Sequence, residues 1–178
     1  MQSARTPIPR LSGLLALALC LASAATADTM TAASMLSDIK ARGARAVFKS
    51  IENTPRWDEV LTHVESGERQ WLKVAVMLYS ATDAGDSEML TLAAGVALLR
   101  RPRDVLIYAA PTLGIQFVCG QPVEGDPGVE TPTKLLAYLD ARIAAVSRLT
   151  GVDVAAARTS CLKYLTEARS QAASSNGL

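Results

Sequence analysis

The sequence has little histidine and few aromatic residues. His63 is the single histidine in 178 residues, and Phe, Trp and Tyr together make up 4% of the chain. A zinc site built on two or three histidines is therefore impossible, and a serine triad would have to use His63 as its base. His63 would lie between Glu59 and Ser66 on one helix surface, where a nucleophile normally lacks a pocket and an oxyanion hole. We interpret His63 as a partly exposed helix residue, and we predict no catalytic, cofactor-binding or metal-binding residue.

Net charge is also small. The 18 Lys and Arg residues against 17 Asp and Glu residues give a formal charge of +1. This balance argues against broad attraction to nucleic acid or anionic lipid, so no nucleic-acid partner is expected. The densest positive cluster, Arg100, Arg101 and Arg103, is interpreted as a solvated helix junction, with a binding patch as the alternative.

Residues 1–27 have the features of a secretory signal peptide. Two arginines give a positive start, an uncharged apolar run covers residues 11–25, and small residues end at Ala27. We predict cleavage between Ala27 and Asp28, which would place the mature protein in the periplasm or the external medium. No apolar run reaches the roughly 20 residues that span a bilayer, so no stable membrane insertion is expected after removal of the signal.

The cysteines predict one disulfide. A lipoprotein signal needs a small residue before its cysteine, and Leu19 precedes Cys20, so a lipid anchor is not expected. Cys119 and Cys161 remain in the mature chain, and an even pair in an oxidising compartment is most simply a disulfide. The alternative is a redox-active or metal-binding pair. Redox motifs place their cysteines two residues apart, and a metal site would need more ligands.

Apolar residues recur at helical spacing along the mature chain, and sustained strand-like alternation is missing. We predict a single all-α domain over residues 28–169 and a flexible tail over 170–178. Six or seven helices are expected in antiparallel hairpins, as an orthogonal bundle or a short solenoid-like stack. The expected helices cover residues 31–51, 55–66, 68–80, 86–100, 102–110, 131–149 and 152–168.

Two of these segments carry specific expectations. The helix over 86–100 would be capped by Asp86 or Ser87, with inward positions Met89, Leu92, Ala93, Val96 and Leu99. Residues 112–131 are rich in Gly and Pro and are expected to form a long irregular connection that contains Cys119. Within it, the loop from Gly114 to Gly128 is the segment most expected to carry function.

Other candidate clusters have ordinary structural explanations. Trp57 and Trp71 each lie on the apolar face of a predicted helix, so we expect core packing, with a ligand platform as the alternative. Asp83, Asp86 and Glu88 lack the spacing of a calcium loop, and turn formation and helix capping account for them.

Glu65-Ser66-Gly67 after an apolar helix resembles the lytic transglycosylases, which place a catalytic glutamate before a serine near a helix end. The resemblance implies a glycan-cleaving enzyme with Glu65 as its acid, recessed in an apolar cleft that raises its pKa. The aromatic and Gly-rich segments that line the groove of that family are missing here.

A longer pattern resembles a group of uncharacterised exported α-helical proteins of proteobacteria. It covers about residues 55–165 and implies fold and location, with no activity. The general outline is also similar to the periplasmic immunity proteins of type VI secretion, which neutralise cell-wall hydrolases, at the level of architecture. The residues that carry the longer pattern are Trp57-x-x-Val60-Leu61, Glu65-Ser66-Gly67, Trp71-Leu72 with Val74-Ala75, Asp83-Ala84-Gly85, Ser87-Glu88, Pro102 with Val105-Leu106, Val118-Cys119 and Cys161-Leu162.

Three functions therefore stay open. The first is an exported, non-enzymatic protein that binds another protein, which predicts an exposed apolar patch or groove. The second is an immunity or inhibitor protein whose protruding loop plugs the cleft of a hydrolase. The third is the glycan-cleaving enzyme that uses Glu65.

Overall fold

The computed structural model describes residues 30–120 and 129–175, and every regular element in these segments is helical. The predicted signal peptide and cleavage site lie outside the described residues. Because α6, the π-helix η1 and α7 follow one another without a break, they form one continuous helix, and the described residues hold nine helices. The elements are α1 (Ala32–Arg42), α2 (Ala44–Ile51), α3 (Pro55–Glu65), α4 (Arg69–Tyr79), α5 (Ala84–Ala97), α6 (Pro102–Asp104), η1 (Val105–Ala109), α7 (Ala110–Leu113), α8 (Ile115–Gly120), α9 (Pro132–Ser147) and α10 (Val152–Ser175).

The all-α class is confirmed, but the predicted count of six or seven helices is too low. The predicted helix over 31–51 is divided at Gly43, whose φ of +85° suits a residue without a side chain. The second additional helix is α8, which lies inside the stretch expected to be irregular. Gly114 precedes α8 and Gly120 is its last residue, and the glycines of this stretch had favoured an irregular segment.

Side chains cap several helices as the residue types predict. Thr31, Thr54 and Thr131 each accept a hydrogen bond from a backbone N–H of the first turn. At α5 the cap is Asp83, whose carboxylate accepts from the Asp86 N–H at 3.0 Å. The expectation that Asp86 or Ser87 would cap this helix is therefore wrong.

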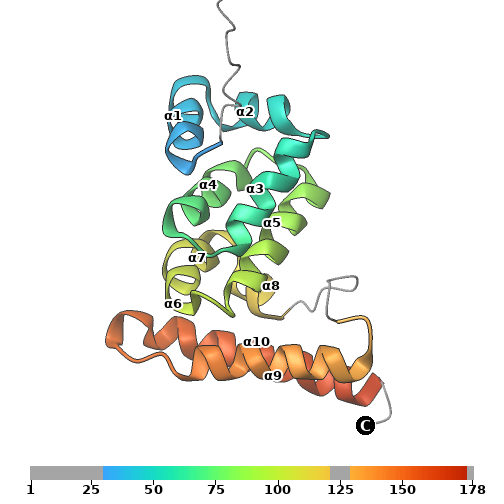
Figure 1. Ribbon diagram of the computed structural model, residues 1–178. Coiled ribbons are helices and arrows are strands. Elements are labelled where there is room, and N and C mark those ends of the chain that lie inside the picture. Colours follow the sequence, from blue (N-terminus) through green and yellow to red (C-terminus); the bar gives the residue numbers. More distant parts are fainter. Residues whose placement is uncertain (1–29, 121–128, 176–178) are drawn as a thin grey trace, which may run out of the picture.

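The helices are stacked along one long axis in Figure 1. Helices α1 to α8 form the upper body, and α9 and α10 lie side by side as a long antiparallel hairpin across its lower end. Contacts of α10 with α8 join the hairpin to the body. Buried apolar side chains from both parts belong to one core, in which Leu72, Val74 and Leu78 of α4 are completely buried.

Helix α5 turns a different face to the core from the one expected. The buried apolar positions are Leu90, Ala93, Ala94, Ala97 and Leu98, together with Gly95. Both α3 and α8 pack against α5, and small side chains let their backbones approach closely. Since α5 is apolar almost all round, its hydrophobic period did not decide which side faces inward.

Helix α10 is longer than predicted. It continues to Ser175, through residues expected to belong to a flexible tail, and Ala172 is buried. Leu165, Ala168 and Ala172 extend one apolar stripe along the helix, and an ion pair between Arg169 and Asp140 joins α10 to α9. No helix in the described segments is both long and apolar enough to cross a bilayer.

The Asp83 cap can be tested by substitution. We expect Asp83→Ala to lower the free energy of unfolding by about 1 kcal/mol, because the Asp86 N–H loses its acceptor. Ser87→Ala is the control, since its hydroxyl donates to the Ala84 carbonyl inside the helix and caps nothing. Urea unfolding at neutral pH measures both variants. Equal stability of the two would contradict this assignment of the cap.

Candidate binding surface

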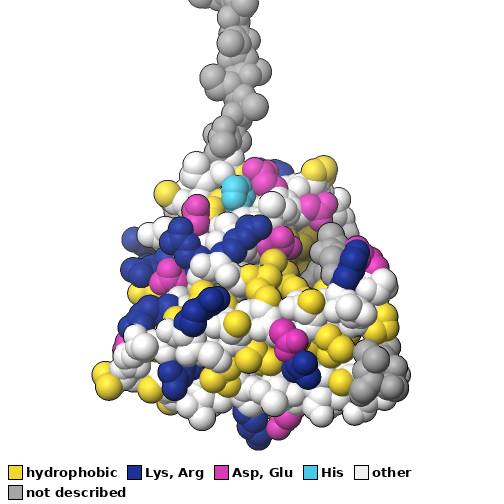
Figure 2. All heavy atoms as spheres, turned by 60° about the horizontal axis from the view of Figure 1, so that its bottom comes forward, with side chains coloured by type: hydrophobic (Ala, Val, Ile, Leu, Met, Phe, Trp, Pro, Cys, Tyr) yellow, Lys and Arg dark blue, Asp and Glu magenta, His cyan; other side chains and the backbone are white. Residues whose placement is uncertain are grey.

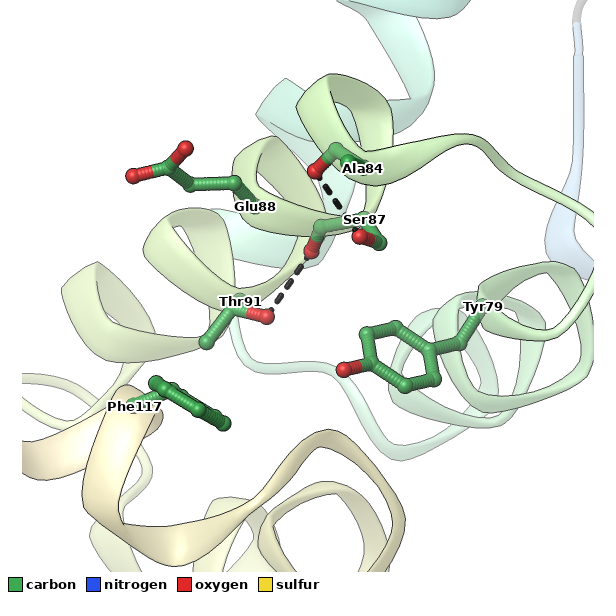
Figure 3. Close-up of a pocket in the computed structure, with 6 residues that line it drawn as sticks. All are labelled: Tyr79, Ala84, Ser87, Glu88, Thr91 and Phe117. Atoms are coloured by element: carbon green, nitrogen blue, oxygen red, sulfur yellow. Dashed lines mark hydrogen bonds between the residues drawn. The ribbon is translucent and has the colours of Figure 1, made fainter.

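A small hollow opens between α4, α5 and α8 (Figure 3). It encloses about 210 Å³, which is below the usual range of roughly 300–1,000 Å³ for small-molecule pockets. A space of this size suits one or two side chains of a partner better than a complete ligand. The lining residues are Tyr79 of α4, Ala84, Ser87, Glu88 and Thr91 of α5, and Phe117 of α8.

The walls of the hollow are suited to contact and carry no arrangement for catalysis. The Thr91 hydroxyl donates to the Ser87 carbonyl at 2.8 Å, and the Ser87 hydroxyl donates to the Ala84 carbonyl at 2.9 Å. Both hydroxyl protons are thus engaged by the helix itself, and no base contacts either of them. Figure 3 shows the Glu88 carboxylate turned away from the aromatic rings of Tyr79 and Phe117. The hollow therefore offers aromatic surface with one carboxylate at its rim.

Phe117 is the exposed aromatic residue of this surface. Its side chain is 44% exposed, and it lies on α8 one turn after Gly114. A Cβ atom at Gly114 would come within 2.8 Å of the Phe117 ring, and the φ of Gly114 is +88°. Glycine at this position therefore permits both the turn into α8 and the placement of the ring.

An apolar stripe runs along the outward face of α5 from the edge of the hollow. We call Met89, Leu92, Val96 and Leu99 the α5 stripe. Met89 is 40% exposed and Leu99 is 38% exposed, while Leu92 and Val96 are half-buried. Glu88 and Leu92 are neighbours at i, i+4 spacing, so the stripe continues directly from the hollow. These four residues were predicted to face the core together with Ala93, and among the five only Ala93 is buried.

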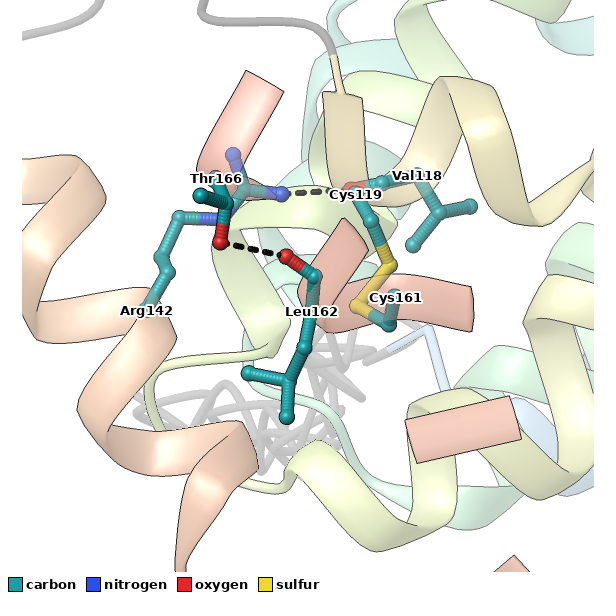
Figure 4. The surroundings of a disulfide bond; sticks show 6 residues. All are labelled: Val118, Cys119, Arg142, Cys161, Leu162 and Thr166. Carbon is teal, nitrogen blue, oxygen red and sulfur yellow. Dashed lines mark hydrogen bonds between the residues drawn. A yellow bond between two sulfur atoms is a disulfide. The ribbon is translucent and has the colours of Figure 1, made fainter. Parts of the chain in front are cut away.

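The predicted cysteine pair links α8 to α10. The sulfur atoms of Cys119 and Cys161 lie 2.06 Å apart, at bonding distance, and both residues are completely buried (Figure 4). Cys119 lies in a helix, where we had expected an irregular loop. The bond ties α8 to the middle of α10, so Phe117, two residues before Cys119, has a fixed position at the hollow.

A buried arginine reinforces this junction, and the sequence analysis missed it. Arg142 of α9 is 1% exposed, and its Nη2 donates to the Val118 carbonyl (Figure 4). The guanidinium of Arg142 also lies 5.4 Å from the centre of the Tyr138 ring. A carbonyl in the last turn of α8 thereby gains a charged donor. The available signal was the i, i+3, i+7 spacing of Leu139, Arg142 and Val146, which places the arginine on the buried face.

Gly95 of α5 provides the space for this arginine. A Cβ atom at Gly95 would lie 3.0 Å from the Val118 carbonyl oxygen and 3.1 Å from Arg142 Nη2. Both distances are shorter than ordinary van der Waals contacts. Three helices therefore meet at one point, and the absence of a side chain on α5 allows it.

The residues considered for catalysis lie elsewhere. His63 is half-buried, stacks on Trp71 with ring centres 4.3 Å apart, and has its Nε2 3.8 Å from a Glu59 carboxylate oxygen. Ser66 does not face His63 as a nucleophile, because its hydroxyl donates to the His63 carbonyl at 2.6 Å. Glu65 is half-buried at the end of α3 and does not line the hollow.

The remaining candidates from the sequence are explained by packing. Trp57 and Trp71 are both buried, as predicted for core residues, and Trp57 meets the Phe48 ring edge-on at 5.3 Å.

Burial raises the pKa of the Asp86 carboxyl above its usual range, and the Asp83 carboxylate raises it further. Across the described segments, no group of three or more His, Cys, Asp or Glu side chains could hold a metal ion.

Only the first part of the candidate loop from Gly114 to Gly128 lies within the described residues. Residues 115–120 form α8, so this part is helical and anchored by Cys119. Residues 121–128 lie outside the described residues.

In comparisons with known proteins, no family model, no curated protein and no solved structure matches this chain.

The disulfide should contribute strongly to stability. We expect replacement of both Cys119 and Cys161 by alanine to lower the free energy of unfolding by up to about 4 kcal/mol, because the pair closes a long loop in the unfolded chain. Urea unfolding of the oxidised protein and of the double variant measures the difference. Mass mapping that found both thiols free in the native protein would contradict the bond.

Alanine substitutions at Gly95 and Gly85, both on α5, should change the free energy of unfolding in opposite directions. We expect Gly95→Ala to destabilise the protein by about 1–3 kcal/mol, since its Cβ would press on Val118 and Arg142. At Gly85 the nearest atom would be an Asp83 carboxylate oxygen at 3.6 Å, an ordinary contact. Gly85→Ala should therefore gain up to about 1 kcal/mol from helix propensity. Equal effects in denaturant unfolding would contradict the close three-helix junction.

Proposed function

We propose that this chain is an exported, non-enzymatic helical protein that binds another protein through the α5 stripe and the adjoining hollow. The observation that carries this proposal is the outward position of the α5 stripe beside the exposed Phe117 ring. Protein interfaces combine apolar or aromatic anchors with a polar rim. The described surface has both, with Phe117 as the anchor and Glu88 at the rim.

The spacing of the stripe indicates what kind of partner would fit. Met89 lies on α5 and Leu99 lies two residues after its end, ten residues further along the chain, so the stripe is about 15 Å long. A partner helix or extended segment with an apolar face of this length would cover the stripe. One of its side chains would enter the hollow and contact the rings of Tyr79 and Phe117.

The sequence supports export independently of the binding surface. Residues 1–27 have the order of charge, apolar run and small residues that signal peptidase requires. The buried cysteine pair suits the oxidising compartment that export would reach.

The two alternatives receive no separate support from the described geometry. An acid at Glu65 would need an apolar cleft of its own, and the hollow is lined by other residues. An immunity protein would be a special case of the present proposal, in which the partner is a cell-wall hydrolase.

Site-specific photo-crosslinking tests the proposed surface. A benzoylphenylalanine placed at Met89 or Leu99 should form adducts with one partner protein in the exported fraction, because both positions face outward. The same group at Thr159, an exposed position of α10, is the control. Adducts of equal yield from all three positions would show non-specific contact and contradict the proposal.

Once the partner is captured, Phe117→Ala should weaken its binding about tenfold or more, as expected for the loss of an aromatic anchor. Isothermal titration calorimetry measures the affinity, and circular dichroism checks the fold of the variant. An unchanged affinity would show that the partner does not use the hollow.

A further inference from the structure

We infer that a basic patch beside Tyr108 docks this protein peripherally on an anionic lipid surface. We define the basic patch as Arg69, Lys73, Arg100 and Arg101. This inference goes beyond the proposed function, because it concerns other residues and a different class of partner. It involves surface contact alone, without insertion of any helix.

Arg69 and Lys73 of the basic patch lie on α4, and Arg100 and Arg101 lie in the connection between α5 and α6. The Arg69 guanidinium lies 4.7 Å from the centre of the Tyr108 ring, and Lys73 Nζ lies 6.0 Å from the same centre. The Arg101 side chain packs against Gly67, where a Cβ atom would come within 2.8 Å of it. Gly67 is two residues before Arg69, so Arg101, Arg69 and Lys73 follow one another along the start of α4.

Most of this positive charge is not neutralised locally. Arg69 pairs with Asp104, with Nη2 to Oδ1 at 3.0 Å, and this contact raises the pKa of the Arg69 guanidinium. Among the ion pairs of the described residues, none involves Lys73, Arg100 or Arg101. Figure 2 shows Lys and Arg side chains, with Asp and Glu side chains between them, along the left side of the face in view. A near-neutral protein therefore carries a local excess of positive charge, which attracts anions at short range.

An exposed apolar residue on the turn that Arg103 contacts favours a lipid surface over an acidic protein. Arg103 donates to the Thr150 carbonyl at 2.8 Å and to both carboxylate oxygens of Asp153, which fixes the turn between α9 and α10 against α6. Val152 at this turn is 97% exposed. Basic side chains together with exposed apolar side chains are typical of a protein surface that rests in a lipid headgroup layer.

Vesicle co-sedimentation tests the inference with the full chain as it is recovered from the cell. The probes are vesicles of phosphatidylglycerol mixed with phosphatidylcholine, and vesicles of phosphatidylcholine alone. We expect binding to the anionic vesicles that weakens as salt is raised. Equal binding to both vesicle types, or binding to neither, would overturn the inference.

Variants in which basic residues are replaced by glutamine test whether the basic patch is responsible for vesicle binding. Replacing Lys73, Arg100 and Arg101 together by glutamine should weaken vesicle binding on the order of a hundredfold, since each basic group near an anionic surface contributes about a fivefold factor. The control replaces Lys134 and Lys163 by glutamine, because both are exposed on α9 and α10, away from Tyr108. Loss of binding in the control alone, or an unchanged triple variant, would overturn the inference.

Two further measurements distinguish binding to lipid from binding to an acidic protein. If the triple variant binds vesicles normally but loses its crosslinked protein partner, the basic patch serves an acidic protein and the lipid assignment is wrong. The α5 variant Leu99→Ser should bind vesicles like the parent chain, so failure of the protein-binding proposal would leave this test unaffected.

Discussion

The attachment of α8 to the α9–α10 hairpin is the constraint on which the rest of this structure depends. Helix α8 has six residues, too few to be stable without tertiary contacts. The Cys119–Cys161 bond and the donation from Arg142 to Val118 hold it from two sides. The same junction joins the upper helices to the hairpin, together with contacts that α6 and η1 make with α9 and α10.

The packing of α5 follows from this junction. Arg142 and the Val118 carbonyl need space on α5, and Gly95 provides it. With that side of α5 turned inward, its small residues face α3 and α8, and the larger Met89 and Leu99 side chains face outward. The proposed binding surface is therefore a consequence of how the core is packed. An apolar face remains outside because the close approach of three helices requires small residues inside.

The basic patch arises at a second junction, where the continuous helix over residues 102–113 widens into a π-helix. There the Ala110 N–H bonds to the Val105 carbonyl, and Pro111 follows within α7. Such segments are frequent at functional sites. The widened segment carries Tyr108 toward α4, where its ring meets Arg69 and Lys73. The two proposed surfaces use different residues, with Leu99 and Arg100 adjacent in the chain, and can be separated by substitution of Met89 and Lys73.

Local patterns in the sequence determined the helical class, the approximate position of most helices, the cysteine pair and the burial of both tryptophans. These features depend on neighbours within one or two turns, or on the small number of cysteines available. The exposed and buried sides of α5, the role of Arg142, the helix at 115–120 and the length of α10 were decided by tertiary structure. The physical reason is the same in each case: an element that is apolar all round, or that places a charge on its apolar side, has no preferred orientation until other helices pack against it.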